Sequence, residues 1–209
     1  MDWTENVIIA DADYVDRVAF NLTVNFERMI GRRIPQADMA RWVECIALDG
    51  GMRPPASHLT SPTSHLSPPT SHPSTQVVLV HDTERGRMEN FTPGCYADEL
   101  DGKAFAGNLG EFTFVCPSPE GMTTKENLFL DTLQLVVQAE GVKRLMVVPS
   151  EEHLNSVRQL LRRFDDDSRR TTVFTMQPLT GSIPFRQEIL GYSLMAALGV
   201  KGDELNPEN

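Results

Sequence analysis

The chain has 209 residues, a size typical of one domain rather than two. Its 40% hydrophobic and 23% charged residues exclude a chain that is disordered or membrane-embedded throughout, and predict a soluble globule. The 19 basic and 29 acidic side chains leave a net charge of −10, which repels a phosphate backbone, so we expect no nucleic-acid binding.

The first part of the chain reads as a buried strand followed by two amphipathic helices. Val7–Ala10 is a short apolar run typical of a buried strand. Apolar residues then recur every three or four positions over Val15–Ile30, which predicts a long helix that ends at Gly31. The same spacing over Met39–Ile46 predicts a second helix, which Gly50–Gly51 closes.

Residues 54–75 differ sharply from their surroundings, because nearly all of them are Pro, Ser, Thr or His. The triplets at 57–59, 64–66 and 71–73 each begin with Ser-His and follow one another at seven-residue intervals. Prolines within the repeat are incompatible with a coiled coil, so we expect a low-complexity loop inserted into the domain.

The rest of the chain alternates strands and helices. Apolar strands are predicted at 77–80, 112–115, 145–148 and 171–176, with irregular structure over 82–110. Helices are predicted at 124–140 and, capped by Ser150, along the apolar stripe from Leu154 to Phe164. The order predicts a single domain over 1–209, an α/β three-layer sandwich with a mostly parallel, Rossmann-like sheet flanked by helices.

A last helix is predicted over Phe185–Leu198, a segment in which apolar residues dominate. Such a helix is buried either in the core of its own chain or against a second copy. We therefore expect a homo-oligomer, with Phe185–Leu198 as its interface, as one of two readings of this segment.

The cysteines and apolar runs indicate a compartment. Cys45, Cys95 and Cys116 form no C-x-x-C pair, which fits neither a disulfide framework nor a zinc site. The acidic first residues do not resemble a signal peptide, and the longest apolar runs fall far short of the roughly 20 residues that span a bilayer. We expect a cytoplasmic protein without membrane contact.

Carboxylates follow two of the predicted strands. Asp11 and Asp13 come after the first strand, and Glu151 and Glu152 follow the strand at 145–148. Ligands of open parallel sheets gather at the carboxyl ends of strands, and carboxylate oxygens are the ligands that Mg²⁺ prefers. The pattern thus permits a Mg²⁺-dependent phosphoester hydrolase in which Asp11 and Asp13 act. Alternatively, one of the aspartates caps the first helix, and the glutamates only interact favourably with the dipole of the helix that follows them. In that case we expect a binding or self-associating module.

Two enzyme families share features with these segments. Residues 7–15, VIIADADYV, resemble the first motif of haloacid-dehalogenase-type phosphohydrolases, and this resemblance implies Asp11 as nucleophile and Asp13 as general acid. The element order is also similar to PIN-like and NYN-type metal nucleases, which implies acidic groups at Asp11, Asp131 and Glu151.

A broader resemblance covers most of the chain outside the insertion. The stretches NVIIADADYVDRVAFNLTVNFERMIGR and PFRQEILGYSLMAALG resemble an uncharacterised family of Bacteroides-type gut bacteria, a domain of unknown function. This resemblance implies no established activity.

Overall fold

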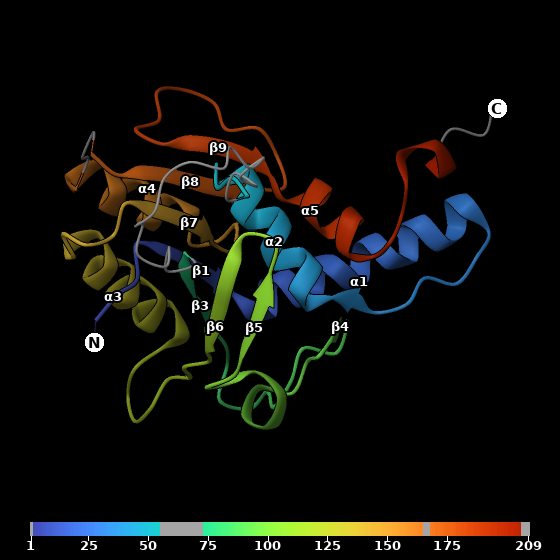
Figure 1. The fold of residues 1–209 in the computed structure, drawn as a ribbon, viewed down its shortest axis with the longest axis horizontal. Coiled ribbons are helices and arrows are strands. Elements are labelled where there is room, and N and C mark those ends of the chain that lie inside the picture. The colour runs from blue at the N-terminus through green and yellow to red at the C-terminus, as the bar shows by residue number, and fades with distance from the viewer. Residues whose placement is uncertain (1, 55–72, 165–167, 206–209) are drawn as a thin grey trace, which may run out of the picture.

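The computed structural model describes residues 2–54, 73–164 and 168–205. Most of the predicted low-complexity insertion, residues 55–72, lies outside the described residues. Figure 1 shows the chain as a central sheet with helices on both sides.

The centre of the fold is a seven-stranded sheet with the order β5-β6-β3-β1-β7-β8-β9. All neighbouring strands pair in parallel except β5, which runs antiparallel to β6. Its strands are β1 (Asn6–Asp11), β3 (Ser74–Val80), β5 (Ala104–Gly107), β6 (Gly110–Val115), β7 (Arg144–Val148), β8 (Arg170–Thr175) and β9 (Arg186–Ile189). Outside this sheet, β2 (Ala37–Asp38) pairs with β4 (Phe91–Thr92). The predicted α/β class and mostly parallel sheet are confirmed.

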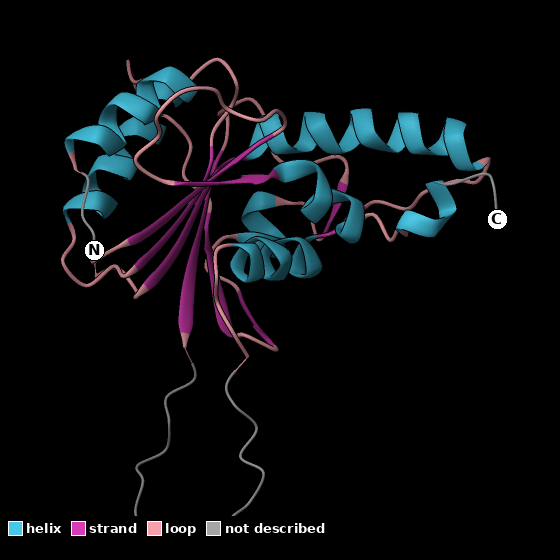
Figure 2. Cartoon of the chain, turned by 90° about the horizontal axis from the view of Figure 1, so that it is seen from above, coloured by secondary structure: helices cyan, strands magenta, loops and turns pink. Residues whose placement is uncertain are grey.

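Helices cover both faces of the sheet, as Figure 2 shows. One face packs on α1 (Ala12–Ile30), α2 (Met39–Asp49) and α5 (Leu190–Ala197), and the other on α3 (Lys125–Gln138) and α4 (Leu154–Arg163). Because side chains alternate along a strand, Ile8 and Ala10 of β1 enter the first core, whereas Val7 and Ile9 enter the second. Two short helical turns, Tyr96–Leu100 and Gly202–Leu205, complete the described elements.

The helix ends follow the local sequence. The Asp11 carboxylate accepts a hydrogen bond from the Tyr14 backbone N–H at 3.1 Å, which caps α1. Gly31 ends the same helix in the left-handed region, at a φ of 68° that favours glycine. The prediction that an aspartate caps this helix is therefore confirmed.

Two predicted boundaries are wrong. The predicted helix over Phe185–Leu198 begins instead with strand β9, and only Leu190–Ala197 is helical. Three of the four residues of β9 are polar and consecutive, so they carry no apolar signal, and the pairing with β8 alone makes the segment a strand. The second wrong boundary is the start of α4. The helix was predicted to follow a cap at Ser150, but it begins at Leu154, and the Ser150 hydroxyl lies 2.9 Å from the His153 ring.

The apolar character of α5 matches its position inside the chain's own core. Leu190, Leu194 and Ala197 are buried in the cluster that also contains residues of α1 and α2. Tyr192 is the exception on this helix, since 68% of its surface is exposed. Within the described segments, no helix combines the length and the apolarity needed to cross a bilayer.

Candidate functional site

The strand order reverses beside β1, and the point of reversal lies at the carboxyl edge of the sheet. From β1 the chain moves to β3 and β6 on one side, and then returns to β7 and β8 on the other. The helix after β1 covers one face of the sheet and the helix after β7 covers the opposite face. In open α/β sheets this divergence is where ligands bind.

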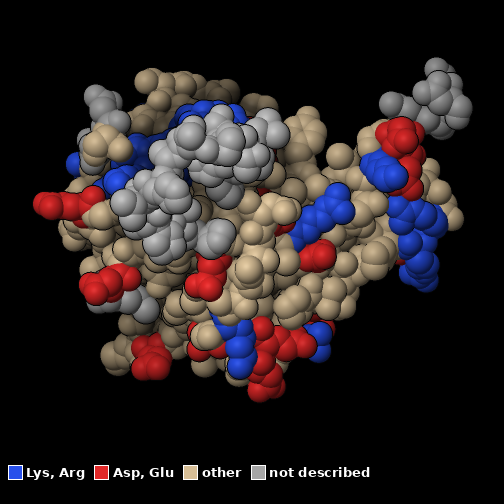
Figure 3. Space-filling model, viewed as in Figure 1, with Lys and Arg blue, Asp and Glu red and all other residues tan. Residues whose placement is uncertain are grey.

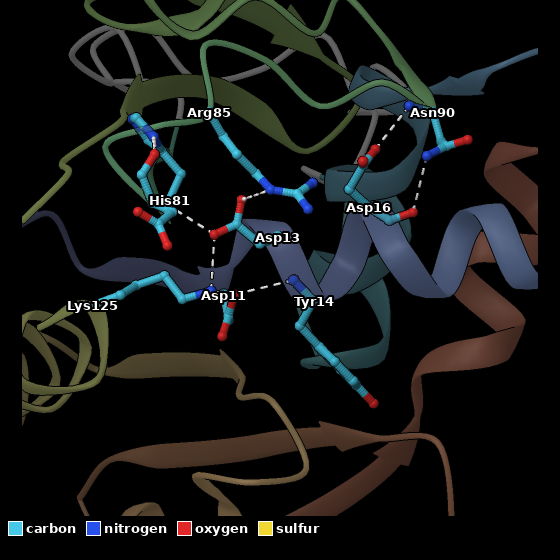
Figure 4. A network of polar contacts seen from close by, with 9 residues as sticks. Asp11, Asp13, Tyr14, Asp16, His81, Arg85, Asn90 and Lys125 are labelled. Atoms are coloured by element: carbon cyan, nitrogen blue, oxygen red, sulfur yellow. Dashed lines mark hydrogen bonds and ion pairs between the residues drawn. The ribbon is translucent and has the colours of Figure 1, made fainter.

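A lysine lies between the two predicted aspartates at this edge. Lys125 Nζ is 2.7 Å from Asp11 Oδ1 and 2.9 Å from Asp13 Oδ2 (Figure 4). The side chains of Asp11 and Asp13 are only 4% and 12% exposed, and that of Lys125 is 22% exposed. The three groups form a nearly buried ion cluster that joins β1 and α1 to the first turn of α3.

The same aspartates fix the loop that follows β3. Asp13 Oδ2 accepts a hydrogen bond from the Asp82 backbone N–H at 2.9 Å, and Arg85 Nε lies 3.7 Å from Asp13 Oδ1. Further along α1, Asp16 accepts a hydrogen bond from the Asn90 backbone N–H at 2.8 Å. Figure 4 shows these groups side by side along the first turns of α1. Each of the three aspartates at the start of α1 therefore contacts groups of the chain itself.

The charge state of Lys125 follows from this surrounding. Burial acts to lower the pKa of Lys125, but hydrogen bonds and charge attraction from Asp11 and Asp13 together outweigh it and raise the pKa. Lys125 therefore remains an ammonium at neutral pH, and it provides the positive charge that two buried carboxylates require.

The predicted glutamates do not join this cluster. Glu151 Oε1 accepts a 3.4 Å hydrogen bond from the Tyr14 hydroxyl, and Glu152 lies exposed in the turn before α4. Burial, followed by the charge of Glu151, raises the pKa of Tyr14, so the phenol remains protonated. No group of three His, Cys, Asp or Glu side chains that could hold a metal ion occurs among the described residues. Magnesium binding at these positions stays a prediction.

A hollow of about 320 Å³ lies between α1 and the residues that follow β7 and β8. Its wall combines one stripe of α1 with Glu151, which follows β7, and Met176 and Gln177, which follow β8. The α1 residues that line it are Tyr14, Arg17, Val18, Asn21, Leu22 and Asn25. The Arg17 guanidinium also lies 5.7 Å from the centre of the Tyr14 ring, within the range of a cation–π contact.

Sequence reasoning missed Lys125 and the polar wall of the hollow. A signal for Lys125 exists, because it directly follows Thr124, the residue at which a helix was predicted to start. Tyr14, Arg17, Asn21 and Asn25 are spaced by three or four positions, so they share one face of the predicted helix. Attention to apolar periodicity alone overlooks such a polar stripe.

Comparison with known proteins gives one match. A family of unknown function (DUF6621) matches residues 1–205. Neither the curated proteins nor the solved structures contain a match. The resemblances to haloacid-dehalogenase-type and to PIN- and NYN-type enzymes thus receive no support.

Proposed function

The chain belongs to this family of unknown function, as the resemblance over most of its length implied. From its geometry, we propose that the protein is a binding module for a small polar molecule. The observation that carries this proposal is the hollow at the carboxyl ends of β7 and β8, beside the reversal of strand order. Its volume of about 320 Å³ is at the lower end of the range for ligand pockets.

The lining indicates the chemistry of the ligand. Glu151 offers acceptor oxygens to a hydroxyl or amino group, and Arg17 offers donors to a carboxylate or another acceptor. Asn21, Asn25 and Gln177 add amide groups that both donate and accept. A molecule with hydroxyl or amino donors at one end and an acidic group at the other matches this wall, and free amino acids and sugar acids are of this class.

The test is a thermal-shift screen with free amino acids and sugar acids, since a ligand that binds only the folded state raises its melting temperature. We expect at least one compound to stabilise the protein, and Glu151→Gln to abolish that effect. Glu152→Gln is the matched control, because Glu152 is the exposed neighbour outside the hollow. Absence of any stabilising compound, or a shift that both variants retain, would refute the proposal.

A second candidate is a Mg²⁺-dependent phosphoester hydrolase that uses Asp11 and Asp13. The observation in its favour is that oxygens of both aspartates converge on one point at the strand ends, where Lys125 Nζ now lies. Mg²⁺ would have to displace the ammonium or bind the remaining oxygens. One of these, Asp13 Oδ1, is buried and accepts no hydrogen bond among the described residues.

A metal titration separates the two candidates. The chelator-stripped protein and Asp11→Asn are heated with Mg²⁺ or Mn²⁺ and with the ions absent. The hydrolase candidate requires a metal-dependent rise in melting temperature that Asp11→Asn loses. Equal melting temperatures with and without metal would reject it and leave the binding module.

Two further expectations belong with this proposal. A cytoplasmic location is supported by the three cysteines, all of which are free thiols.

Self-association through Phe185–Leu198 would have to use the exposed Tyr192, because the apolar face of α5 is turned inward. Light scattering over a range of concentrations tests it, and a constant monomer mass would exclude the homo-oligomer.

A further inference from the structure

Three arginines line up at the amino edge of the sheet, opposite the hollow. Arg144 is the register partner of Arg170 across β7 and β8, and Arg186 pairs with Thr172 across β8 and β9. Paired residues of neighbouring strands point to the same face, and Thr172 is two positions from Arg170. Arg144, Arg170 and Arg186 therefore project on one face, the face that α2 and α5 cover.

The α2 helix adds to this group at its C-terminal end. Gly51 lies against Arg170, since a Cβ atom at this glycine would overlap with the Arg170 guanidinium group. Arg53 follows two residues later and is exposed. Burial, and then the charges of Arg186, Arg144 and Arg53, lower the pKa of Arg170. Figure 3 shows basic side chains gathered over the part of the molecule where β8 and β9 lie.

Although Arg144 Nη1 donates to Asn6 Oδ1 at 3.0 Å, other donors of this group have no partner among the described residues. The Nε atoms of Arg144 and Arg170 are buried and form no hydrogen bond with any described residue. The Thr172 hydroxyl, on a residue with 0% of its surface exposed, is likewise unpaired there. Buried polar groups without a hydrogen-bond partner are rare and lower the stability of a protein. A bound ligand with acceptor oxygens would satisfy these three donors.

The neighbouring arginine, Arg169, differs from Arg170 because each nitrogen of its guanidinium group is hydrogen-bonded. Arg169 donates from all three guanidinium nitrogens to backbone carbonyls near the end of α3, at 2.7–3.2 Å. Arg170 has no such acceptors among the residues described. Of the described carboxylates on this face, Glu188 lies 3.3 Å from Arg186, and Asp49 forms no ion pair within the described segments. Among the described residues, the charges that act on Arg170 are those of three arginines and of one carboxylate, Glu188, so positive charge prevails around this guanidinium.

We propose that Arg144, Arg170 and Arg186, with the Thr172 hydroxyl, form a binding site for a phosphate group. Guanidinium groups present parallel donors that match the oxygens of a phosphate, and a doubly charged anion offsets the repulsion among them. This site is independent of the proposed hollow, since the two lie at opposite edges of the sheet.

Titration calorimetry with inorganic phosphate tests the site, at an ionic strength held constant with NaCl to remove general screening. Glycerol 3-phosphate forms a second arm, and its binding relative to phosphate tells whether the group is accepted free or as an ester. We expect saturable binding of one or both, weakened at least about tenfold in Arg170→Gln, the loss expected from one charge-assisted hydrogen bond.

The controls keep this test decisive. Arg186→Gln replaces a half-exposed side chain, so it should fold even where a change at Arg170 fails, and it should weaken binding similarly. Arg28→Gln, an exposed arginine in the last turn of α1, should leave binding unchanged. No saturable binding, or equal binding by all three variants, would overturn the proposal.

Discussion

Replacement of Lys125 by methionine should strongly destabilise the protein. The variant keeps an unbranched side chain that is one atom shorter, but removes the charge that lies 2.7 Å and 2.9 Å from Asp11 and Asp13. Two nearly buried carboxylates are then left without their counter-ion, and loss of one partner from a buried ion pair costs about 3–5 kcal/mol. Because Asp13 keeps its hydrogen bond from Asp82 and its contact with Arg85, we expect the lower value, about 3 kcal/mol.

Urea denaturation at neutral pH measures this loss, and a chain of this size should melt about 2–4 °C lower per kcal/mol. The matched control is Lys143→Met, which removes an exposed pair with Glu5 and should cost less than about 1 kcal/mol. Adding Asp11→Asn to Lys125→Met should restore part of the stability, because it removes one of the stranded charges.

The pH dependence supplies an independent check. The pKa of Lys125 is raised in the folded state, so its contribution is complete below the ordinary lysine value of about 10.5 and declines as pH rises through the folded value. The wild type should therefore lose stability on the alkaline side faster than Lys125→Met does. A cost close to that of Lys143→Met, or parallel alkaline profiles, would refute this account of the cluster.

Three further predictions concern the scaffold. Asp38→Ala removes the side chain that caps α2 through the Arg41 backbone N–H and should cost about 1 kcal/mol in urea denaturation; no change would contradict the capping role. Leu194→Ala should cost about 2–5 kcal/mol without a change of oligomeric mass in light scattering, because this side chain packs within the chain's own core. Arg32 lowers the pKa of Glu204 to about 2, so hydrogen-exchange protection of 202–205 should fall as pH drops from about 4.5 toward 2; protection that stays constant over this interval would contradict the contact.

The sequence was sufficient for the parts of the fold that depend on apolar periodicity. The buried β1, the long α1 and its end at Gly31 follow from local patterns, because burial on one face imposes a fixed spacing. The strand β9 was not predictable in this way. Its residues Arg186–Ile189 carry no alternation of apolar and polar character, and only its partner β8 makes it a strand.

The candidate site was predicted in location but not in composition. The carboxyl ends of the strands could be chosen from sequence, since a parallel sheet brings them to one edge. That Lys125 meets Asp11 and Asp13 could not, because 112 or more residues separate them and only the packing of α3 brings them together. The arginine row likewise depends on the register of β7 and β8, which no local pattern specifies.

The central claim is that a small polar ligand occupies the hollow between α1 and the ends of β7 and β8. NMR of protein labelled with ¹⁵N at Asn and Gln observes side-chain amides that line it, and Asn21→Asp and Gln177→Glu assign two of them. With a stabilising amino acid or sugar acid, the account predicts shifts in the resonances of Asn21 and Gln177 and none in the amide of the distant Gln36. Shifts confined to other amides, or no shift at saturating compound, would contradict it.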